Sequence, residues 1–240
     1  YNIGFSTKIE SAVDRFSLGA AFADLLERHH ALRMLFPSEF GLPRGHLCAV
    51  DEYPFELEYE EVDCESQLAH VIAEHARHVF DLASGPLFMA KLVQTGVDRY
   101  TLLINVHHMC FDGWSMDVLV REGNTSYDAR VHGGIASLPA LSIQYYDYAA
   151  WQRAHVRGDV IAAQDAYWTE KLLGGKIEPI GLQMDGKRPG SARATGGHVR
   201  RTLGRSVLDS LTALARATDL TFFMVVTALV EIVLARHASS

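Results

Sequence analysis

The sequence contains little of what several functional classes need. It has only three cysteines in 240 residues, and no two of them have CxxC spacing; they are Cys48, Cys64 and Cys110. This pattern fits neither a disulfide-stapled fold nor a cysteine-rich zinc site, and it predicts a reducing, cytoplasmic setting. The formal net charge is −7, and no cluster of Lys and Arg interleaved with aromatic residues is present. We therefore do not expect a nucleic-acid partner.

Long apolar runs are also scarce. The longest, residues 220–235, contains Glu231 and is shorter than the roughly 20 residues that a membrane-spanning helix needs. The first four residues show no basic segment followed by an apolar one, so neither a signal peptide nor a membrane partner is predicted. The chain begins without Met and ends directly after an apolar helical pattern. We expect it to be a piece of a longer polypeptide, incomplete at both ends.

Apolar residues that recur every three or four positions predict helices. The predicted helices cover residues 14–30, 66–79, 115–129, 142–156 and 160–173, and two more flank a turn at 218–221. Asp14 stands where a helix needs a capping residue, and the segment 218–221 is predicted to supply both the turn and the cap of the last helix.

Strands are predicted by period-two alternation and by β-prone runs. Residues 55–60 alternate apolar with Glu, which is typical of an edge strand with one wet face. Residues 87–93 and 99–106 form a predicted hairpin through the turn 95–98, and the nearly continuous apolar run in the second strand predicts burial on both faces. A last strand is predicted at 198–203, after a linker rich in Gly, Pro and Arg at 174–197. The fold class is therefore α+β, an α/β sandwich.

The segment from His107 to Ser115 carries the most chemical information. Two histidines end a buried strand, and Asp112 and Gly113 follow before a helix begins. Neighbouring residues on a strand point to opposite faces, so only one of the two imidazoles can face a given cavity. Histidine titrates near neutrality, and a strand end followed by a short loop is a rigid place to hold it. Gly113 allows close approach of a ligand or a positive φ.

Several other interpretations of this segment remain open from the residues alone. A buried histidine is more often structural than catalytic, and Asp112 stands where an aspartate caps a helix. Cys110 is a weak candidate nucleophile, since no separate orienting residue is evident. A zinc site formed by His107, His108 and Asp112 is also weak, because adjacent histidines diverge and HExxH spacing is absent.

The segment His107-His108-x-x-x-Asp112-Gly113-Trp114-Ser115 resembles the HHxxxDG motif of condensation domains of nonribosomal peptide synthetases. Residues 28–36 (RHHALRMLF) are similar to the RHExLRTxF signature of that family, and 145–151 (YYDYAAW) to its YxDFAxW signature. Residues 80–87 and 1–3 also resemble family landmarks. These signatures follow one another along essentially the whole chain, but the extreme N-terminal signature and most of the second lobe of the family domain are missing.

The resemblance implies a chloramphenicol-acetyltransferase-like fold with two lobes and a tunnel between them. Residues 1–173 would form the N-terminal lobe, 174–197 a linker and 198–240 the start of the C-terminal lobe. The implied reaction is attack of an acceptor aminoacyl amine on a donor thioester. Both substrates would arrive on 4′-phosphopantetheine arms of upstream and downstream peptidyl carrier proteins, in a synthetase that also contains an adenylation domain. The family pattern uses no metal and no directly bound cofactor.

The resemblance also implies residue roles. His108 would be at the active centre, as a base, as a group that positions the amine, or as a hydrogen-bond donor to the tetrahedral intermediate. His107 would be structural, and Gly113 would allow close approach of the thioester end of a pantetheine arm. We expect Asp112 to form an ion pair with Arg33, or else with Arg28.

Trp114 and Ser115 are expected to line the tunnel, and they resemble the subtype that joins an L-configured donor to an L-acceptor. The aromatic residues of 145–151 are interpreted as packing rather than substrate-binding groups. Competing functions are an acyltransferase of the same fold with a small-molecule acceptor, a non-catalytic module that docks carrier proteins and, more distantly, a metal hydrolase. We expect the isolated chain to be inactive, because the tunnel needs both lobes.

Overall fold

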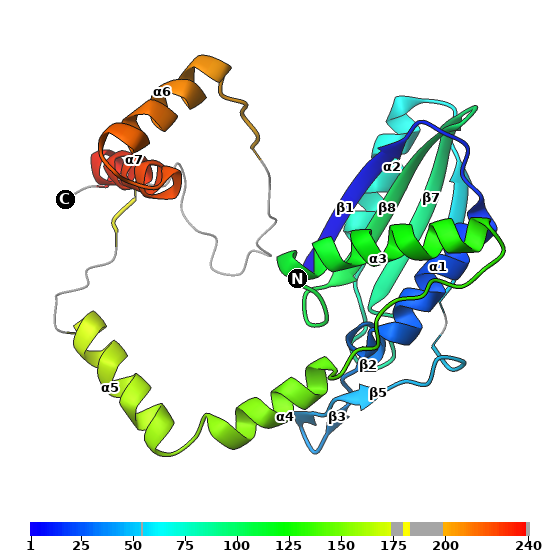
Figure 1. Cartoon of the computed structure of the whole chain (residues 1–240), viewed down its shortest axis with the longest axis horizontal. Coiled ribbons are helices and arrows are strands. Elements are labelled where there is room, and N and C mark those ends of the chain that lie inside the picture. The colour runs from blue at the N-terminus through cyan, green and yellow to red at the C-terminus, as the bar shows by residue number, and fades with distance from the viewer. Residues whose placement is uncertain (54, 174–179, 183–198, 239–240) are drawn as a thin grey trace. The chain divides into compact units, whose positions relative to one another are not determined.

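The computed structural model describes residues 1–53, 55–173, 180–182 and 199–238 (Figure 1). The chain divides into two compact units, Tyr1–Arg157 and Gly158–Ser240. Of the predicted linker at 174–197, only 180–182 is described. The division into lobes at 1–173, 174–197 and 198–240 therefore stays a prediction.

The first unit is built on a four-stranded sheet in the order β1-β8-β7-β6. These strands are β1 (Asn2–Ile9), β6 (Glu58–Glu61), β7 (Phe88–Gly96) and β8 (Arg99–His107). β7 and β8 form the predicted hairpin, in which Val97 and Asp98 make the turn and Asp98 has a φ of +50°. β1 pairs antiparallel with β8, whereas β6 pairs parallel with β7.

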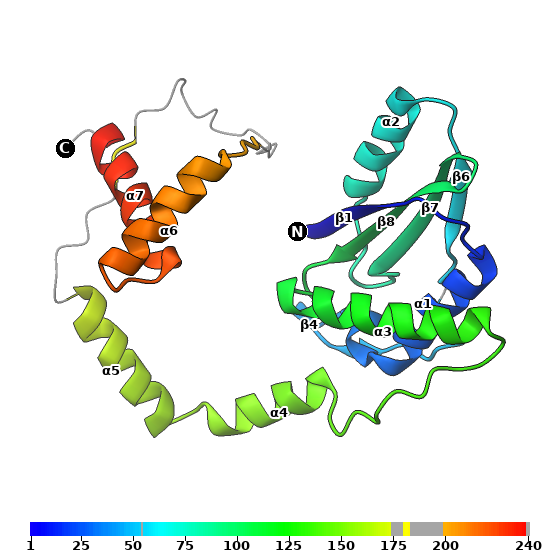
Figure 2. The same ribbon diagram turned by 45° about the horizontal axis from the view of Figure 1, so that its top comes forward.

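Helices cover both faces of this sheet (Figures 1 and 2). On one face, α1 (Arg15–Arg28) and α3 (Gly113–Val131) pack their apolar side chains against Phe88 and Ile104. On the other face, α2 (Glu65–Ala76) contributes Val71 to a second core that includes Leu103. Leu103 and Ile104 are neighbours on β8 that point to opposite faces, so the predicted burial of this strand on both faces is confirmed.

Helix α1 begins where a capping residue predicts it. The Asp14 carboxylate accepts from the backbone N–H of Phe16 at 3.0 Å. Near the middle of the helix, Asp24 accepts from the Arg130 guanidinium and the Ser126 hydroxyl of α3, which ties the two helices together. Behind α1 follow a short 3-10 helix and two small strand pairs: η1 (His30–Arg33), β2 (Met34–Leu35) with β5 (His46–Leu47), and β3 (Ser38–Glu39) with β4 (Leu42–Pro43).

Two strand predictions need correction. The strand predicted at 55–60 begins only at Glu58, because Phe55 leaves the sheet register and packs its ring against Phe22 and Phe88, at centroid distances of 6.1 and 5.7 Å. Its place at a sheet edge is confirmed. The strand predicted at 198–203 is wrong, since the described residues 199–203 form no strand. A β-strand needs a hydrogen-bonding partner, and the described part of the second unit offers it no sheet.

The remaining predicted helices are present, as α4 (Tyr145–His155) in the first unit and as α5 (Asp159–Leu173), α6 (Arg205–Ala217) and α7 (Phe222–His237) in the second. Thr221 caps α7 by accepting from the N–H of Met224 at 3.2 Å, as predicted. In the described residues no single helix is long and apolar enough to cross a membrane; α6 and α7 meet that criterion only together, and the chain bends by 108° between them.

Candidate active site at the end of strand β8

The histidine pair lies where β8 ends and the chain turns toward α3. His107 is the last residue of the strand, and His108 begins the turn. The His108 side chain is exposed, while its backbone N–H donates to the carbonyl oxygen of Tyr1 at 2.8 Å. Tyr1, directly before the start of β1, therefore holds the backbone of His108, while the imidazole is exposed and can meet another molecule.

The His107 ring is engaged within the chain instead. Its Nδ1 accepts from the backbone N–H of Met109 at 3.1 Å, and its ring packs edge-on against Phe80 at a centroid distance of 6.1 Å. Burial lowers the pKa of His107, so the neutral imidazole that can accept this hydrogen bond is favoured. The two histidines diverge as the strand geometry predicts.

Asp112 caps helix α3. Its carboxylate accepts from the Ser115 backbone N–H at 2.9 Å and from the Ser115 hydroxyl at 2.6 Å. The Ser115 hydroxyl oxygen in turn accepts a hydrogen bond from the Asp112 backbone N–H at 3.3 Å, which completes a capping box. These hydrogen bonds, the Ser115 hydroxyl first, hold the pKa of the Asp112 carboxyl below its usual range.

The ion pair predicted between Asp112 and Arg33 or Arg28 is wrong. Arg33 is 4% exposed and donates to the backbone carbonyls of Leu26, Glu27 and Cys48. It therefore satisfies carbonyls of the last turn of α1, where a cation is favoured by the helix dipole. Arg28 pairs elsewhere, with its Nε 2.9 Å from Glu122 Oε2. Between the described side chains, no ion pair reaches Asp112.

Glu122 is a buried carboxylate that the sequence interpretation missed. It lies on α3 and accepts from Arg28 Nε at 2.9 Å, and its Oε2 lies 2.7 Å from His29 Nε2. Burial alone would raise the pKa of Glu122, but the bonds with His29 and Arg28 outweigh it and the pKa is lowered. A signal was available, since Glu122 follows the buried Leu119 by three positions on a helix and so shares its inward face.

The signatures at 28–36 and 145–151 meet in space. Just before α4, Gln144 donates through Nε2 to the carbonyl of Arg28 at 3.0 Å and accepts from the N–H of His30 at 3.2 Å. The Tyr146 ring stacks on His30 at a centroid distance of 5.8 Å. The other aromatic side chains of the segment pack on one another within α4; they are Tyr145, Tyr148 and Trp151. All four rings remain at least 40% exposed, so the interpretation of this group as packing rather than substrate-binding residues stays a prediction.

Gly113 and Trp114 leave open space beside the motif. A Cβ built on Gly113 would meet no atom within 4 Å, and its φ is not positive, so the chain itself does not need a glycine there. The Trp114 side chain is 84% exposed. Ser115 differs, because its hydroxyl is engaged in the capping box. Room for a ligand therefore exists at Gly113 and Trp114.

The Cys110 thiol is unsuited to nucleophilic chemistry. Burial raises its pKa to about 12, and it donates to the carbonyl oxygen of His107 at 3.2 Å. The reactive form of cysteine is the thiolate, which this environment disfavours. For metals, the described ranges contain no group of three or more His, Cys, Asp or Glu side chains placed to hold an ion.

Comparison with known proteins shows which family this chain is similar to. The condensation domain family matches the chain over residues 1–240. The dimodular nonribosomal peptide synthase of Bacillus subtilis (strain 168) is 36% identical over 230 residues, which are 94% of this chain and 10% of that protein. Tyrocidine synthase 3 of Brevibacillus parabrevis is 32% identical over 238 residues, which cover 99% of this chain and 4% of that protein. The chain thus spans a tenth or less of these relatives.

Solved structures show the same fold. The X-domain from teicoplanin biosynthesis aligns with a TM-score of 0.85 at 24% identity, covering 98% of this chain and 52% of that one. The epimerization domain of the third module of tyrocidine synthetase B aligns with a TM-score of 0.69 at 22% identity, covering 77% and 43%. The predicted mixed α/β fold of chloramphenicol-acetyltransferase-like type is confirmed. On the match over its whole length, the chain belongs to the condensation domain family.

Proposed function

We propose that this chain is part of a condensation domain that forms an amide bond between two carrier-bound substrates, with His108 at the reacting centre. The donor is an acyl or peptidyl thioester and the acceptor is an aminoacyl thioester, each on a 4′-phosphopantetheine arm. The observation that supports this role most directly is the exposure of the His108 imidazole, on a backbone held by Tyr1 before the turn and followed by a capped helix.

The proposed step exchanges one bond for another. The acceptor nitrogen attacks the thioester carbon, the C–S bond breaks, and an amide and a free thiol result. Starting from the neutral amine, the nitrogen loses one proton and the sulfur gains one, so no co-reactant is needed. An α-amine has a pKa of ~8 and is largely protonated near neutrality. His108 would accept its proton, position it, or donate to the tetrahedral intermediate, and a proton-transfer role is typically worth ~100- to 10,000-fold in rate.

The surroundings of His108 support the approach of a long thioester arm. The open space at Gly113 admits a chain close to the backbone, and exposed Trp114 can line its path. Ser115 acts indirectly in this proposal, through the cap that sets the start of α3. His107 holds the turn through the Met109 N–H, and Asp112 holds the helix start, so both support the site without touching the substrate.

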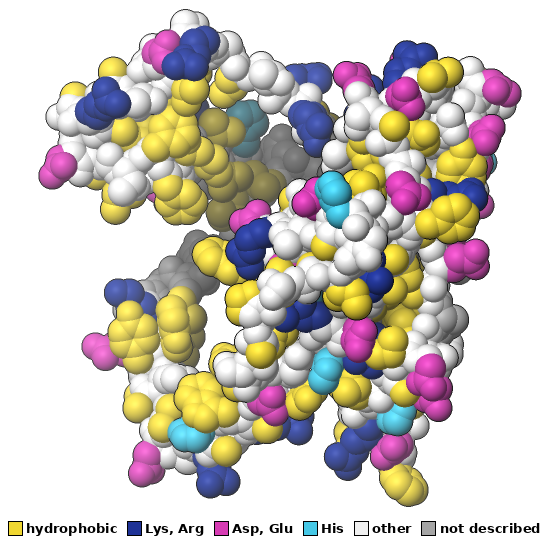
Figure 3. All heavy atoms as spheres, turned by 45° about the vertical axis from the view of Figure 1, so that its right-hand side comes forward, with side chains coloured by type: hydrophobic (Ala, Val, Ile, Leu, Met, Phe, Trp, Pro, Cys, Tyr) yellow, Lys and Arg dark blue, Asp and Glu magenta, His cyan; other side chains and the backbone are white. Residues whose placement is uncertain are grey.

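The proposed setting is a multidomain synthetase. Upstream and downstream peptidyl carrier proteins would deliver the substrates, and an adenylation domain would load them; the far greater length of the relatives supports this. The Trp114-Ser115 pair supports an L-configured donor. A cytoplasmic location stays a prediction from the dispersed cysteines. We expect residues 1–240 alone to form no product, because the proposed tunnel needs both lobes. In the described residues, α6 and α7 expose many apolar side chains (Figure 3).

The test is single-turnover amide formation in the full-length synthetase that carries this chain, with both carriers preloaded. We expect His108→Ala to slow product formation at least 100-fold, and His70→Ala, which removes an exposed histidine from α2, to leave it unchanged. Product formation by His108→Ala at the unaltered rate would refute the catalytic role.

A second candidate is an acyltransferase with a small-molecule acceptor. SgcC5 from Streptomyces globisporus was solved in complex with a naphthyl ethanediol; it aligns with a TM-score of 0.74 at 25% identity and covers 98% of this chain. Use of a freely diffusing acceptor alcohol or amine, with carrier-bound aminoacyl acceptors ignored, would favour this candidate.

A third candidate is a non-catalytic docking module. The X-domain from teicoplanin biosynthesis was also solved in complex with OxyB, and that structure aligns with a TM-score of 0.82 at 25% identity. Unchanged product from the His108→Ala synthetase, together with loss of carrier binding when exposed Trp114 is replaced by Ala, would favour docking.

A further inference from the structure

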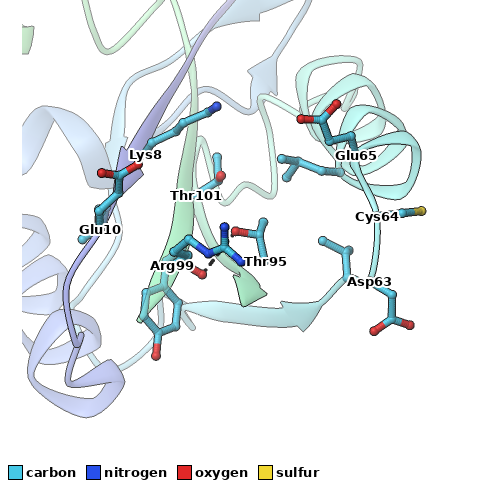
Figure 4. Close-up of a pocket in the computed structure, with 12 residues that line it drawn as sticks. Lys8, Glu10, Asp63, Cys64, Glu65, Thr95, Arg99 and Thr101 are labelled. Carbon is cyan, nitrogen blue, oxygen red and sulfur yellow. Dashed lines mark hydrogen bonds between the residues drawn. The ribbon is translucent and has the colours of Figure 1, made fainter. Parts of the chain in front are cut away.

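A cleft lies at the other end of the sheet from the histidine motif, between the start of β8 and the start of α2 (Figure 4). Its volume is about 280 Å³. β8 runs from Arg99 at this cleft to His107 at the motif, a separation of roughly 27 Å at about 3.4 Å per residue. The cleft is therefore separate from the proposed reaction site.

A buried hydroxyl opens into the cleft. Thr101 is 3% exposed, and it lies on the β8 face that α2 covers, as Leu103 does. Figure 4 shows its side chain beside the space between β8 and α2. In the described residues the fully buried side-chain polar atoms without a hydrogen-bond partner are His75 Nε2 and Asn105 Oδ1, and the Thr101 oxygen is not among them. The Thr101 oxygen therefore reaches the space of the cleft, where it can donate a hydrogen bond to a ligand.

Two cationic side chains border the cleft beside this hydroxyl. Lys8 at the end of β1 and Arg99 at the start of β8 both line the cleft. In the described ranges, neither takes part in an ion pair. Helix α2 begins at the same cleft, and its N-cap residue Cys64 makes no side-chain capping hydrogen bond. The first backbone N–H groups of α2 therefore add a partial positive charge.

Carboxylates and apolar residues limit the ligand further. Glu10, Asp63 and Glu65 also border the cleft, and Figure 4 shows the carboxylate of Asp63 directed away from its centre. Three carboxylates against two cations disfavour a multiply charged anion such as phosphate. The apolar lining consists of Ile9, Val62 and Leu68. The volume lies just below the usual ~300–1,000 Å³ of ligand pockets, so the ligand is fragment-sized.

We propose that this cleft binds a small organic monoanion, a carboxylate with a short apolar body. The carboxylate accepts from the Thr101 hydroxyl and pairs with Arg99 and Lys8, and the apolar body lies against Val62 and Leu68. This site does not depend on the proposed role of His108.

The test is calorimetric titration of hexanoate into the full-length protein that carries this chain. Hexanoate binds at one saturable site, while neutral hexanamide and inorganic phosphate each bind at least tenfold more weakly. Equal binding of hexanamide, tighter binding of phosphate, or no saturable binding of hexanoate would overturn the proposal.

Variants locate the site. Thr101→Val keeps the side-chain volume and removes only the hydroxyl that faces the cleft, so thermal unfolding is unchanged or shifts upward while hexanoate affinity falls at least fivefold. Arg99→Gln lowers the affinity at least tenfold. Arg153→Gln, a matched loss of an exposed cation on α4, and His108→Ala both leave it unchanged. Wild-type affinity in Arg99→Gln and Thr101→Val would place hexanoate elsewhere and refute the assignment.

Discussion

The sheet of the first unit buries its apolar side chains, whereas the α6–α7 pair leaves most of its apolar side chains exposed. Phe88 of β7 is 1% exposed, whereas Phe223 of α7 is 77% exposed. The sheet buries side chains on two faces, because α2 covers one and α1 with α3 the other. Two packed helices bury only the stripe where they meet, and here that stripe contains Ala215 and Val225. Stability in the described chain is therefore concentrated around the sheet.

The largest expected effect follows directly from this contrast. Phe88→Ala should destabilise the first unit by about 3–5 kcal/mol, because it removes a ring packed against Phe22 and Phe55 and leaves a cavity. Phe16→Ala makes the same chemical change on α1, where the ring is 78% exposed, and should cost less than about 0.5 kcal/mol. Amide hydrogen exchange of β8 in the full-length protein measures both costs. Equal costs would show that burial of the ring does not decide its contribution to stability.

A smaller loss is expected where α1 meets α3. Glu122→Gln keeps the shape of the side chain but removes the charge that Arg28 and His29 share, and it should cost about 2 kcal/mol. Glu74→Gln on α2 is the control, since its carboxylate is 79% exposed and the cost should be near zero. Amide hydrogen exchange in α1 and α3 measures the loss of stability in both variants. An equal loss in Glu122→Gln and Glu74→Gln would contradict a special role for Glu122.

This loss should also depend on pH. The folded-state pKa of Glu122 is lowered, so the stabilisation is complete above the ordinary glutamate pKa of ~4.3 and is lost as the pH falls through the lower folded value. The difference in unfolding free energy between wild type and Glu122→Gln should therefore be full at pH 7 and shrink below about pH 4. A difference that grows on acidification would contradict this sign.

Substitutions of Asp112 should affect stability as they do at a helix N-cap, and not as they do in an ion pair. Asp112→Ala should destabilise the start of α3 by about 1 kcal/mol, whereas Asp112→Asn, which still caps, should cost only a few tenths. Exchange of the first-turn amides of α3 provides the measurement. If Asp112→Asn destabilises the start of α3 as much as Asp112→Ala, the negative charge of Asp112 is required, as it would be in an ion pair.

The smallest expected change in stability is at Gly113, where a substitution should affect activity but not folding. Gly113→Ala and the control Gly19→Ala in α1 both place a Cβ without a clash and should leave stability unchanged or raise it by up to about 1 kcal/mol. Only Gly113→Ala should slow amide formation, because its Cβ occupies the space proposed for the thioester arm. Equal activity of the two variants would remove the reason for a glycine at 113.

Local signals predicted much of this structure. The caps at Asp14 and Thr221, the hairpin at 95–98 and the strand end at His107 each depend on a few neighbouring residues. Divergence of the two histidines follows from strand geometry alone. These features were predictable because no distant part of the chain decides them.

Pairing between distant residues was not predictable in the same way. Asp112 and Glu122 both lie on or beside α3, and the packing of α1 on α3 decides that Arg28 meets Glu122. Arg33 binds backbone carbonyl oxygens, and because every residue has one, the sequence does not indicate which of them it will bind. The strand expected at 198–203 failed for a related reason, since a strand forms only where a second strand accepts it.

The central claim is that the His108 ring meets the acceptor amine, and the most direct measurement is a structure of the full-length protein with a non-reactive aminoacyl-phosphopantetheine acceptor bound. We predict the amine nitrogen within hydrogen-bond distance of the imidazole, about 2.6–3.2 Å, directly or through one water. An acceptor bound with its amine beyond that reach, and with His108 still turned to solvent, would contradict the account.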